Sequence, residues 1–414
     1  MKGKTMNPTE RIMAVIDGHE LDRVQTCCVS LDDWPVHQVL GKPLIPPRLL
    51  FKNPLSVALA KWIGKHSKRS IDFDGDEIRR IASERTVKKL KKTLVDPFVT
   101  DNLMKRAEAA VALGFDAIHT GFDGRWMIWD EKTLAVNTGS LYDWIEDGHG
   151  NMYYMYREPA IPTSRDFDRW PYFPDTDDMA QRCHDFYLQM MKKYEDKICV
   201  IGDIMFGIHE TLFASVGFEN LVLAIRREPE FIRRFIDYKD EFIFKGVMAM
   251  MDAGVKIVLK GDDMSFKSGP MLNPKTVDEL FGPAYTRLCR AVHDRGGKIL
   301  NHSCGDNTRL FDYFIKWGYD GGHTFETTSN VDIAYEKKTH GDRYTIVGGM
   351  GVDYILTTRS TPEEVREAAR NVIKTCAPGG RFLLAMAHTH PELDVEKIRI
   401  MLEEAKDYGR YPIA

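Results

Sequence analysis

The chain has 414 residues, which is enough for one large domain or two ordinary ones. Its formal net charge of −4, from 57 Lys and Arg against 61 Asp and Glu, argues against nucleic acid or an anionic membrane as a partner. No apolar segment is long enough to cross a bilayer, and the N-terminus predicts an amphipathic helix rather than a signal peptide. Seven cysteines without regular spacing indicate a reducing compartment, so we expect a cytoplasmic protein.

Short apolar runs recur along the chain and alternate with amphipathic helices. Continuous apolar runs suit parallel strands that are covered on both faces. In chain order we predict strands at 23–31, 115–122, 197–205, 255–263, 298–305, 319–326, 343–350 and 381–388. Eight strands alternating with helices predict an α/β fold, the TIM (β/α)8 barrel, rather than a doubly wound sheet. The absence of a G-x-G-x-x-G motif after the first strand also weakens the doubly wound alternative.

Two stretches interrupt this alternation. Residues 32–110 contain more helix than one crossover requires, so we expect an N-terminal helical extension against the barrel. Residues 123–175 carry many aromatics with Gly and Asn turns, which predicts a β-rich insertion after the second strand, over the barrel mouth. Long ordered insertions in compact domains are usually functional. Because no flexible linker is visible, residues 1–414 are expected to form a single domain.

Polar side chains collect at the ends of the predicted strands. The active site of a TIM barrel lies at the carboxyl ends of its strands, where such residues converge. The strand-end candidates are Asp203, Asp262, Asp263, His302, Cys304, Glu326, Met350 and His388. Sulfur, imidazole and carboxylate together suit Zn²⁺ in an open, catalytic site. We therefore predict a zinc site formed by His302, Cys304 and Glu326.

Each of these side chains also has a purely structural explanation. His302 and Cys304 could cap a strand end without metal, and Glu326 could only form a salt bridge. His388 could hydrogen-bond a neighbouring loop, and the two adjacent aspartates could hold Lys260 or a loop amide. Other histidines and cysteines fall inside strands or helices, and we assign them to the core or the surface: His119, His293, His340, Cys27, Cys28, Cys183, Cys199 and Cys289.

Several stretches carry a resemblance to a known family. They are "GDD" at 261–263, "HSCGD" at 302–306, "VGGM" at 347–350, "TPEEVREAARNVIKTCAPGGRFLLAMAH" at 361–388 and "YGRYP" at the C-terminus. These stretches resemble the uroporphyrinogen decarboxylase-like superfamily, which implies the TIM barrel fold. One branch of the superfamily is the decarboxylase, whose arginine-rich signature near the first strand is replaced here by "RVQTCCVSLDDWPVH". The other branch comprises zinc- and cobalamin-dependent methyltransferases, and His-x-Cys is its signature.

The resemblance also implies a ligand pattern, from which this sequence departs. In the methyltransferase branch zinc is held by the His and Cys of strand 5 and, in the coenzyme M enzymes, by a second cysteine before strand 8. The corresponding turn here is "APGG" at 377–380, and Cys376 is expected inside a helix, so we exclude Cys376 as a ligand. With Glu326, or Glu326 and His388, in place of one sulfur, the zinc is a stronger Lewis acid. It then suits an ether oxygen as leaving group while cob(I)alamin attacks the methyl carbon.

The resemblance and the residues together predict a cobalamin-dependent methyltransferase. We expect it to pass a methyl group from a small methylated donor, an aromatic methyl ether, to the corrinoid of a separate corrinoid protein. The alternatives are a methylcobalamin:thiol methyltransferase, a porphyrinogen decarboxylase without cofactor, and a catalytically idle barrel that binds a ligand or a partner. Predicted catalytic residues are Asp262, Asp263 and His388. Predicted substrate-binding residues are Trp126, Trp129, Asp203 and Met350.

Overall fold

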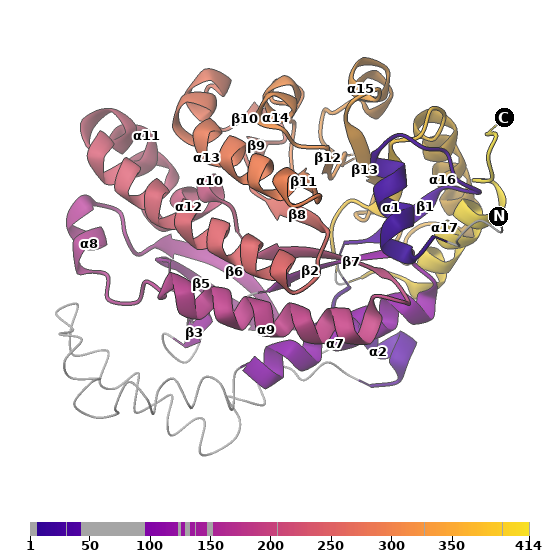
Figure 1. The fold of residues 1–414 in the computed structure, drawn as a ribbon, viewed down its shortest axis with the longest axis horizontal. Coiled ribbons are helices and arrows are strands. Elements are labelled where there is room, and N and C mark those ends of the chain that lie inside the picture. The colour runs from indigo at the N-terminus through magenta and orange to yellow at the C-terminus, as the bar shows by residue number, and fades with distance from the viewer. Residues whose placement is uncertain are drawn as a thin grey trace.

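The eight predicted strands all form, and they close into a parallel barrel in the computed structural model (Figure 1). The structure describes residues 6–29, 31–42, 96–122, 126–128, 133–136, 138–146, 152–204, 206–326, 328–390 and 392–413. Around the barrel the strands follow the order β1-β14-β13-β12-β11-β8-β7-β2. Their bounds are β1 (Gln25–Cys28), β2 (Ala117–Phe122), β7 (Cys199–Ile204), β8 (Ile257–Gly261), β11 (Lys298–His302), β12 (Gly321–His323), β13 (Thr345–Met350) and β14 (Phe382–Met386).

Side chains alternate between the barrel interior and the layer under the helices, as the two-residue period of a strand requires. On β14, Leu383 and Ala385 belong to the interior cluster, whereas Phe382 and Leu384 pack against the outer helices. The outer layer is the larger one, so most of the apolar core lies between the strands and the helices. The fold is therefore the predicted TIM barrel.

Helix α1 (Pro8–Ile16) closes the amino end of the barrel. It begins at a capping box formed by Asn7 and Glu10, and its apolar face joins the interior cluster. The hydroxyl of Thr345, at the start of β13, donates to the carbonyl of Ile16 over 3.3 Å. The barrel is thus plugged at this end, and its carboxyl end is left for chemistry.

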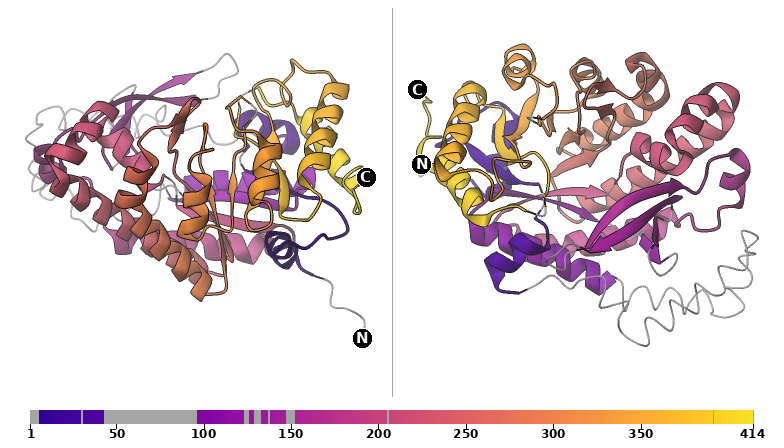
Figure 2. Two further views of the ribbon diagram at one scale, coloured as in Figure 1. Left: turned by 90° about the horizontal axis from the view of Figure 1, so that it is seen from above. Right: turned by 180° about the vertical axis from the view of Figure 1, so that it is seen from behind.

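Helices surround the strands on the outside (Figures 1 and 2). Helix α16 starts with a capping box of Thr361 and Glu364. The helix bounds are α1 (Pro8–Ile16), α2 (Asp33–Leu40), α7 (Asp96–Leu113), α8 (Ser164–Arg169), α9 (Thr176–Tyr194), α10 (Ile208–Val216), α11 (Phe218–Arg227), α12 (Pro229–Asp252), α13 (Pro274–Asp294), α14 (Phe311–Trp317), α15 (Ile333–His340), α16 (Pro362–Cys376) and α17 (Val395–Asp407).

The insertion after the second barrel strand is β-rich, as predicted. It forms a four-stranded antiparallel sheet of β3 (Trp126–Ile128), β4 (Thr133–Val136), β5 (Ser140–Glu146) and β6 (Met152–Pro159). The sheet packs on α10, where the Tyr156 hydroxyl donates to the Ala214 carbonyl over 3.1 Å. Seen from above, this sheet and α1 lie on opposite sides of the barrel (Figure 2, left).

The predicted helical extension is described only in part. Helices α2 and α7 fall within it and contact each other, and residues 43–95 lie outside the described residues. Past β8, a short hairpin of β9 (Ser265–Phe266) and β10 (Gly269–Pro270) borders the barrel mouth. Among the described helices, none is by itself long and apolar enough to cross a membrane. The pair α10 and α11 passes on length and composition, but it is bent by 103°.

Candidate functional site

Side chains that point into the barrel change from apolar to polar toward the carboxyl ends of the strands. On four neighbouring strands the interior apolar cluster includes Ala117, Ile201, Leu259 and Leu300. The residue two positions further along each strand points inward as well. Those positions hold His119, Asp203, Gly261 and His302. The strands thus bring two histidines and an acid together above an apolar floor.

His302, the last residue of β11, has its tautomer fixed by the next strand. It lies in register with His323 of β12, whose Nε2–H donates to the Met386 carbonyl over 2.8 Å. His323 Nδ1 therefore carries a lone pair, and it accepts the Nδ1–H of His302 over 2.7 Å. Burial lowers the pKa of both imidazoles, so both rings stay neutral. The remaining lone pair of His302 is on Nε2, which is the atom a metal would bind.

Cys304 and Asp263 lie beside that nitrogen. The Nε2 of His302 is 3.7 Å from the Cys304 sulfur and 3.7 Å from an Asp263 oxygen. Asp263 is held in place because its carboxylate accepts the backbone N–H of Cys304 over 2.8 Å. The three ligating atoms all lie within 4.8 Å of one another. Nitrogen, sulfur and oxygen at this spacing could hold one metal ion.

The electrostatics of this group favour a cation. Burial, and then the charges of Asp263 and Glu326, raise the pKa of the Cys304 thiol. Without a cation the thiol stays protonated at neutral pH. A divalent metal ion would reverse this effect, because a coordinated thiol is deprotonated. The residues present therefore fit a zinc ion.

Glu326 belongs to a second group of possible ligands, with Asp353 and His388. The Nε2 of His388 lies 3.5 Å from a Glu326 oxygen and 3.9 Å from an Asp353 oxygen. Hydrogen bonding by His388 lowers the pKa of Glu326 to about 2, although burial would raise it. Burial would lower the pKa of His388, but Glu326 and the Thr389 carbonyl outweigh burial and raise it. The two side chains thus form a charged pair, and the predicted ligation of metal by Glu326 stays a prediction.

Asp203 forms a buried ion pair below the predicted metal site. One carboxylate oxygen accepts from the Lys260 ammonium over 2.8 Å, and Lys260 also donates to the Ile204 carbonyl. The other oxygen lies 3.6 Å from Nε2 of His119. Burial would raise the pKa of Asp203, but Lys260 and then His119 lower it to about 2. Asp203 is therefore charged, and its expected contact with substrate stays a prediction.

Asp262 has its carboxylate occupied by contacts within the protein. It accepts the backbone N–H groups of His209 and Glu210, at 3.0 and 2.7 Å, and the hydroxyl of Tyr285 at 2.5 Å. The Cβ that a side chain at Gly207 would add lies 2.0 Å from an Asp262 atom. Asp262 thus caps the N-terminus of α10 from outside that helix. Of the two adjacent aspartates, Asp263 is the one that lies beside the possible metal ligands His302 and Cys304.

The remaining predicted residues are placed less fully. Met350 is fully buried at the end of β13. Trp126 begins β3, but its side chain lies outside the described residues, as does the whole of Trp129. On the same sheet Tyr142 contacts Tyr156 edge to face, which is packing within the insertion and onto α10. The predicted roles of Met350 and of the two tryptophans in substrate binding stay predictions.

Three residues of this region are not among the predicted candidates. His119 is expected in the core because it falls inside a strand, and no motif marks His323 or Asp353. The two-residue alternation that places His302 inward could have found His119 and His323, since both lie on the inward side of their strands. Asp353 follows the end of β13 in a turn, where nothing in the sequence indicates its partners.

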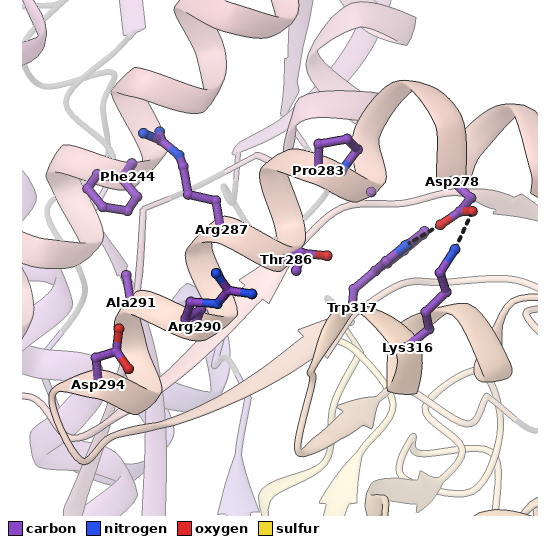
Figure 3. A pocket seen from close by; sticks show the side chains of 11 residues that line it. Phe244, Asp278, Pro283, Thr286, Arg287, Arg290, Ala291, Asp294, Lys316 and Trp317 are labelled. Carbon is purple, nitrogen blue, oxygen red and sulfur yellow. Dashed lines mark hydrogen bonds and ion pairs between the residues drawn. The ribbon is translucent and has the colours of Figure 1, made fainter.

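A separate cavity of about 590 Å³ lies on the outer surface of the barrel, among α12, α13 and α14 (Figure 3). Arg287 stacks over the Phe244 ring at 4.0 Å, and Asp278 accepts from Lys316 and from Trp317. No residue of the strand ends lines this cavity. It therefore does not belong to the site at the barrel mouth.

Comparison with known proteins agrees with this fold. A family model described as uroporphyrinogen decarboxylase (URO-D) matches residues 85–408, which is well over half of the chain. The chain belongs to the uroporphyrinogen decarboxylase family. The match begins before β2 and ends after α17, so it includes the strand ends that carry the possible ligands.

Solved structures give two further similarities. A methyltransferase from Methanosarcina mazei is similar at 14% identity and a TM-score of 0.64, over 98% of this chain and 99% of that chain. A B12-independent methionine synthase from a Shewanella species, in complex with selenomethionine, reaches 11% identity and a TM-score of 0.44, over 75% of this chain and 87% of that chain. The first similarity shows only that the two chains share a fold. The second is too weak to support a conclusion about this chain. No curated protein sequence gives a significant match.

Proposed function

We propose that this protein is a zinc-dependent methyltransferase that moves a methyl group from an aromatic methyl ether to cob(I)alamin on a separate corrinoid protein. The observation that carries the proposal is the group of His302, Cys304 and Asp263, with the lone pair of His302 Nε2 fixed by the His323 hydrogen bond. Membership of the family and the fold shared with the M. mazei methyltransferase support it.

Zinc bound by His302 and Cys304 would supply Lewis-acid polarisation of the ether oxygen. His302 supplies a neutral nitrogen, and Cys304 supplies sulfur. For the third ligand the geometry favours Asp263, because its carboxylate lies within reach of both. Glu326, the ligand expected from the sequence, is the alternative, and it would have to leave its contact with His388.

The other strand-end groups fit roles around this centre. His388 is the group we assign to give a proton to the oxygen that loses its methyl group, since its Nε2 lies between Glu326 and Asp353 at the barrel mouth. Of the two aspartates predicted to be catalytic, Asp263 keeps that role at the metal site. Asp262 is assigned to hold α10. The aromatic insertion would exclude water from the site.

Zinc content and methyl transfer test the proposal together. Purified protein should bind about one zinc per chain, and His302→Ala and Cys304→Ser should lose it. The loaded protein with cob(I)alamin and methoxybenzenes should give methylcobalamin and the free phenol, seen in the corrinoid spectrum. Cys376→Ala is the matched control, because Cys376 is buried at the end of α16, away from the strand ends. Full zinc retention in both ligand variants would refute the metal site.

Two comparisons separate the alternatives. Zinc titration of Asp263→Asn and Glu326→Gln shows which acid binds the metal. Only the variant that has lost a ligand should bind zinc much more weakly. If the protein transfers methyl only from methylcobalamin to added thiols, the direction of transfer is reversed from the one proposed.

The description of the family model makes a decarboxylase the second candidate. Such an enzyme would convert uroporphyrinogen without added metal. Its activity would not require zinc, so His302→Ala would not reduce activity through loss of a metal ligand. Metal-independent decarboxylation by the purified protein would therefore replace the proposed methyl transfer.

A further inference from the structure

His119 presents an unused nitrogen at the barrel mouth. Its Nδ1 lies 3.1 Å from the Val29 carbonyl, which can only accept, so Nδ1 carries the proton. The other nitrogen, Nε2, is buried and makes no hydrogen bond to another described residue. A buried polar atom without a partner is costly, so this nitrogen calls for a ligand or an ordered water.

Asp203 faces that nitrogen with an oxygen that Lys260 does not use. The ammonium of Lys260 donates to the first carboxylate oxygen, and the second lies 3.6 Å from His119 Nε2. This separation is too long for a good hydrogen bond. A hydroxyl oxygen about 2.8 Å from both atoms can donate its one hydrogen to Asp203 and accept from Nε2 when the ring is protonated. When the ring is neutral, both atoms are acceptors and the hydroxyl can donate to only one of them.

A glycine lies beside this pair, on the side of His302. Gly261 is the inward residue of β8, between Asp203 on β7 and His302 on β11. A Cβ added there would meet only Asp203 within 4 Å, at 3.9 Å. The absence of a side chain at Gly261 therefore leaves room on the barrel wall beside Asp203.

We infer that His119 and Asp203 form a subsite for a hydroxyl group of the methyl donor, beside the metal ligands. A hydroxyl suits either state of the ring: it donates to neutral Nε2, or it accepts from the protonated ring while it donates to Asp203. The identity of the donor as a methoxybenzene rests on the proposed function, and the subsite adds that the ring carries a hydroxyl. His119 and Asp203 would thereby position the methoxy group at the metal.

Binding to the zinc-loaded protein tests the subsite without relying on turnover. Calorimetry should compare methoxybenzene with 2-, 3- and 4-methoxyphenol. At least one methoxyphenol should bind about 10- to 100-fold more tightly, because hydrogen bonds to charged groups contribute about 1.5–3 kcal/mol. Equal affinity of all four compounds would overturn the inference, and it would mean that water occupies the subsite.

Variants at position 119 assign the preference to this residue. In His119→Leu, the ratio of the affinities for the methoxyphenol and for methoxybenzene should fall to within about threefold of one. His119→Gln, whose amide can still bond a hydroxyl, should keep part of the preference. His184→Leu, a surface histidine on α9, is the matched control and should keep the wild-type ratio. A preference that survives His119→Leu in a protein with normal zinc content would show that another residue holds the hydroxyl, and it would overturn the inference.

The subsite and the proposed function fail in different ways. If methoxyphenols are preferred but no methyl reaches cob(I)alamin, the proposed function fails and the subsite stands. If methyl transfer occurs with equal affinity for hydroxylated and plain ethers, the proposed function stands and the subsite is refuted.

Discussion

At the scale of single residues, His323 decides which nitrogen of His302 is available. We predict that His323→Phe weakens zinc binding by about 10- to 100-fold, as loss of a residue that orients a metal ligand does. His323→Gln should weaken it less, because a glutamine can accept from His302 and donate to the Met386 carbonyl. Competition with a chelator measures both affinities. Equal affinity in wild type and His323→Phe would show that the hydrogen bond does not orient His302.

The ion pair of Asp203 and Lys260 leads to a second prediction, about how the free energy of unfolding depends on pH. Because the pKa of Asp203 is lowered to about 2 in the folded protein, below its ordinary 3.8, its charge stabilises the fold above about pH 4. That contribution, on the order of 2 kcal/mol, is lost as the pH falls through 2. Asp203→Asn should cost about 3–5 kcal/mol at neutral pH, since it leaves Lys260 charged and buried.

Urea unfolding of wild type and Asp203→Asn at pH 6 and pH 3 measures this effect. The difference in unfolding free energy between them should narrow at the lower pH. Asp101→Asn, which breaks a partly exposed pair with Lys105, should show a difference near zero at both values. A difference of equal size at both pH values for Asp203→Asn would contradict the assignment.

The sequence could predict some of these residues and not others. His302 and Cys304 follow an apolar run and precede a glycine, so their place at a strand end is visible from local pattern alone. Local pattern does not show which acid would join them in a metal site, because Asp263 and Glu326 follow strands on either side of β11. That choice depends on register between strands and on side-chain rotamers, which only the folded barrel defines.

At the scale of elements, Asp262 joins β8 to helix α10. The N-cap of α10 is Gly207, which has no side chain to accept the first N–H groups, and Asp262 accepts two of them instead. We predict that Asp262→Ala lowers the free energy of unfolding by at least about 2 kcal/mol, since a cap and a buried charged hydrogen bond are both lost. Denaturant unfolding measures this loss.

A matched change tests the same contact from the other side. Gly207→Ala should also destabilise, because its Cβ would collide with the Asp262 carboxylate. Gly296→Ala is the steric control, since no atom lies within 4 Å of a Cβ there, although its positive φ of 69° adds a modest cost. If Asp262→Ala keeps full stability but abolishes turnover, the catalytic role expected from the sequence is the better one.

The elements themselves were the most predictable part of the molecule. Most barrel strands, such as β14, are apolar runs covered on both faces, so they are recognised without knowledge of their neighbours. The four-stranded sheet of the insertion was foreseen only as β-rich, because aromatic-rich strands with short turns show their type but not their pairing. The order of the barrel then follows from the right-handed βα connections that parallel strands require.

At the scale of the whole molecule, the barrel separates stability from chemistry. Its amino end is filled by α1 and the apolar interior cluster, and its carboxyl end carries buried charges and neutral histidines. Buried charges and unpaired polar atoms cost stability, which a packed apolar floor can offset. Zinc that joins β8 to β11 would add to stability at the end where the polar groups reduce it.

Thermal unfolding with and without zinc is the last test. A ligand that binds only the folded state stabilises it by about 4 kcal/mol at a free concentration 1,000 times its Kd. For a chain of this length that corresponds to a rise in Tm of a few degrees. Zinc should raise the Tm of wild type and of Cys376→Ala alike, and it should leave the Tm of Cys304→Ser nearly unchanged. An equal rise in all three proteins would place the bound zinc elsewhere on the chain, whatever the methyl-transfer assays show.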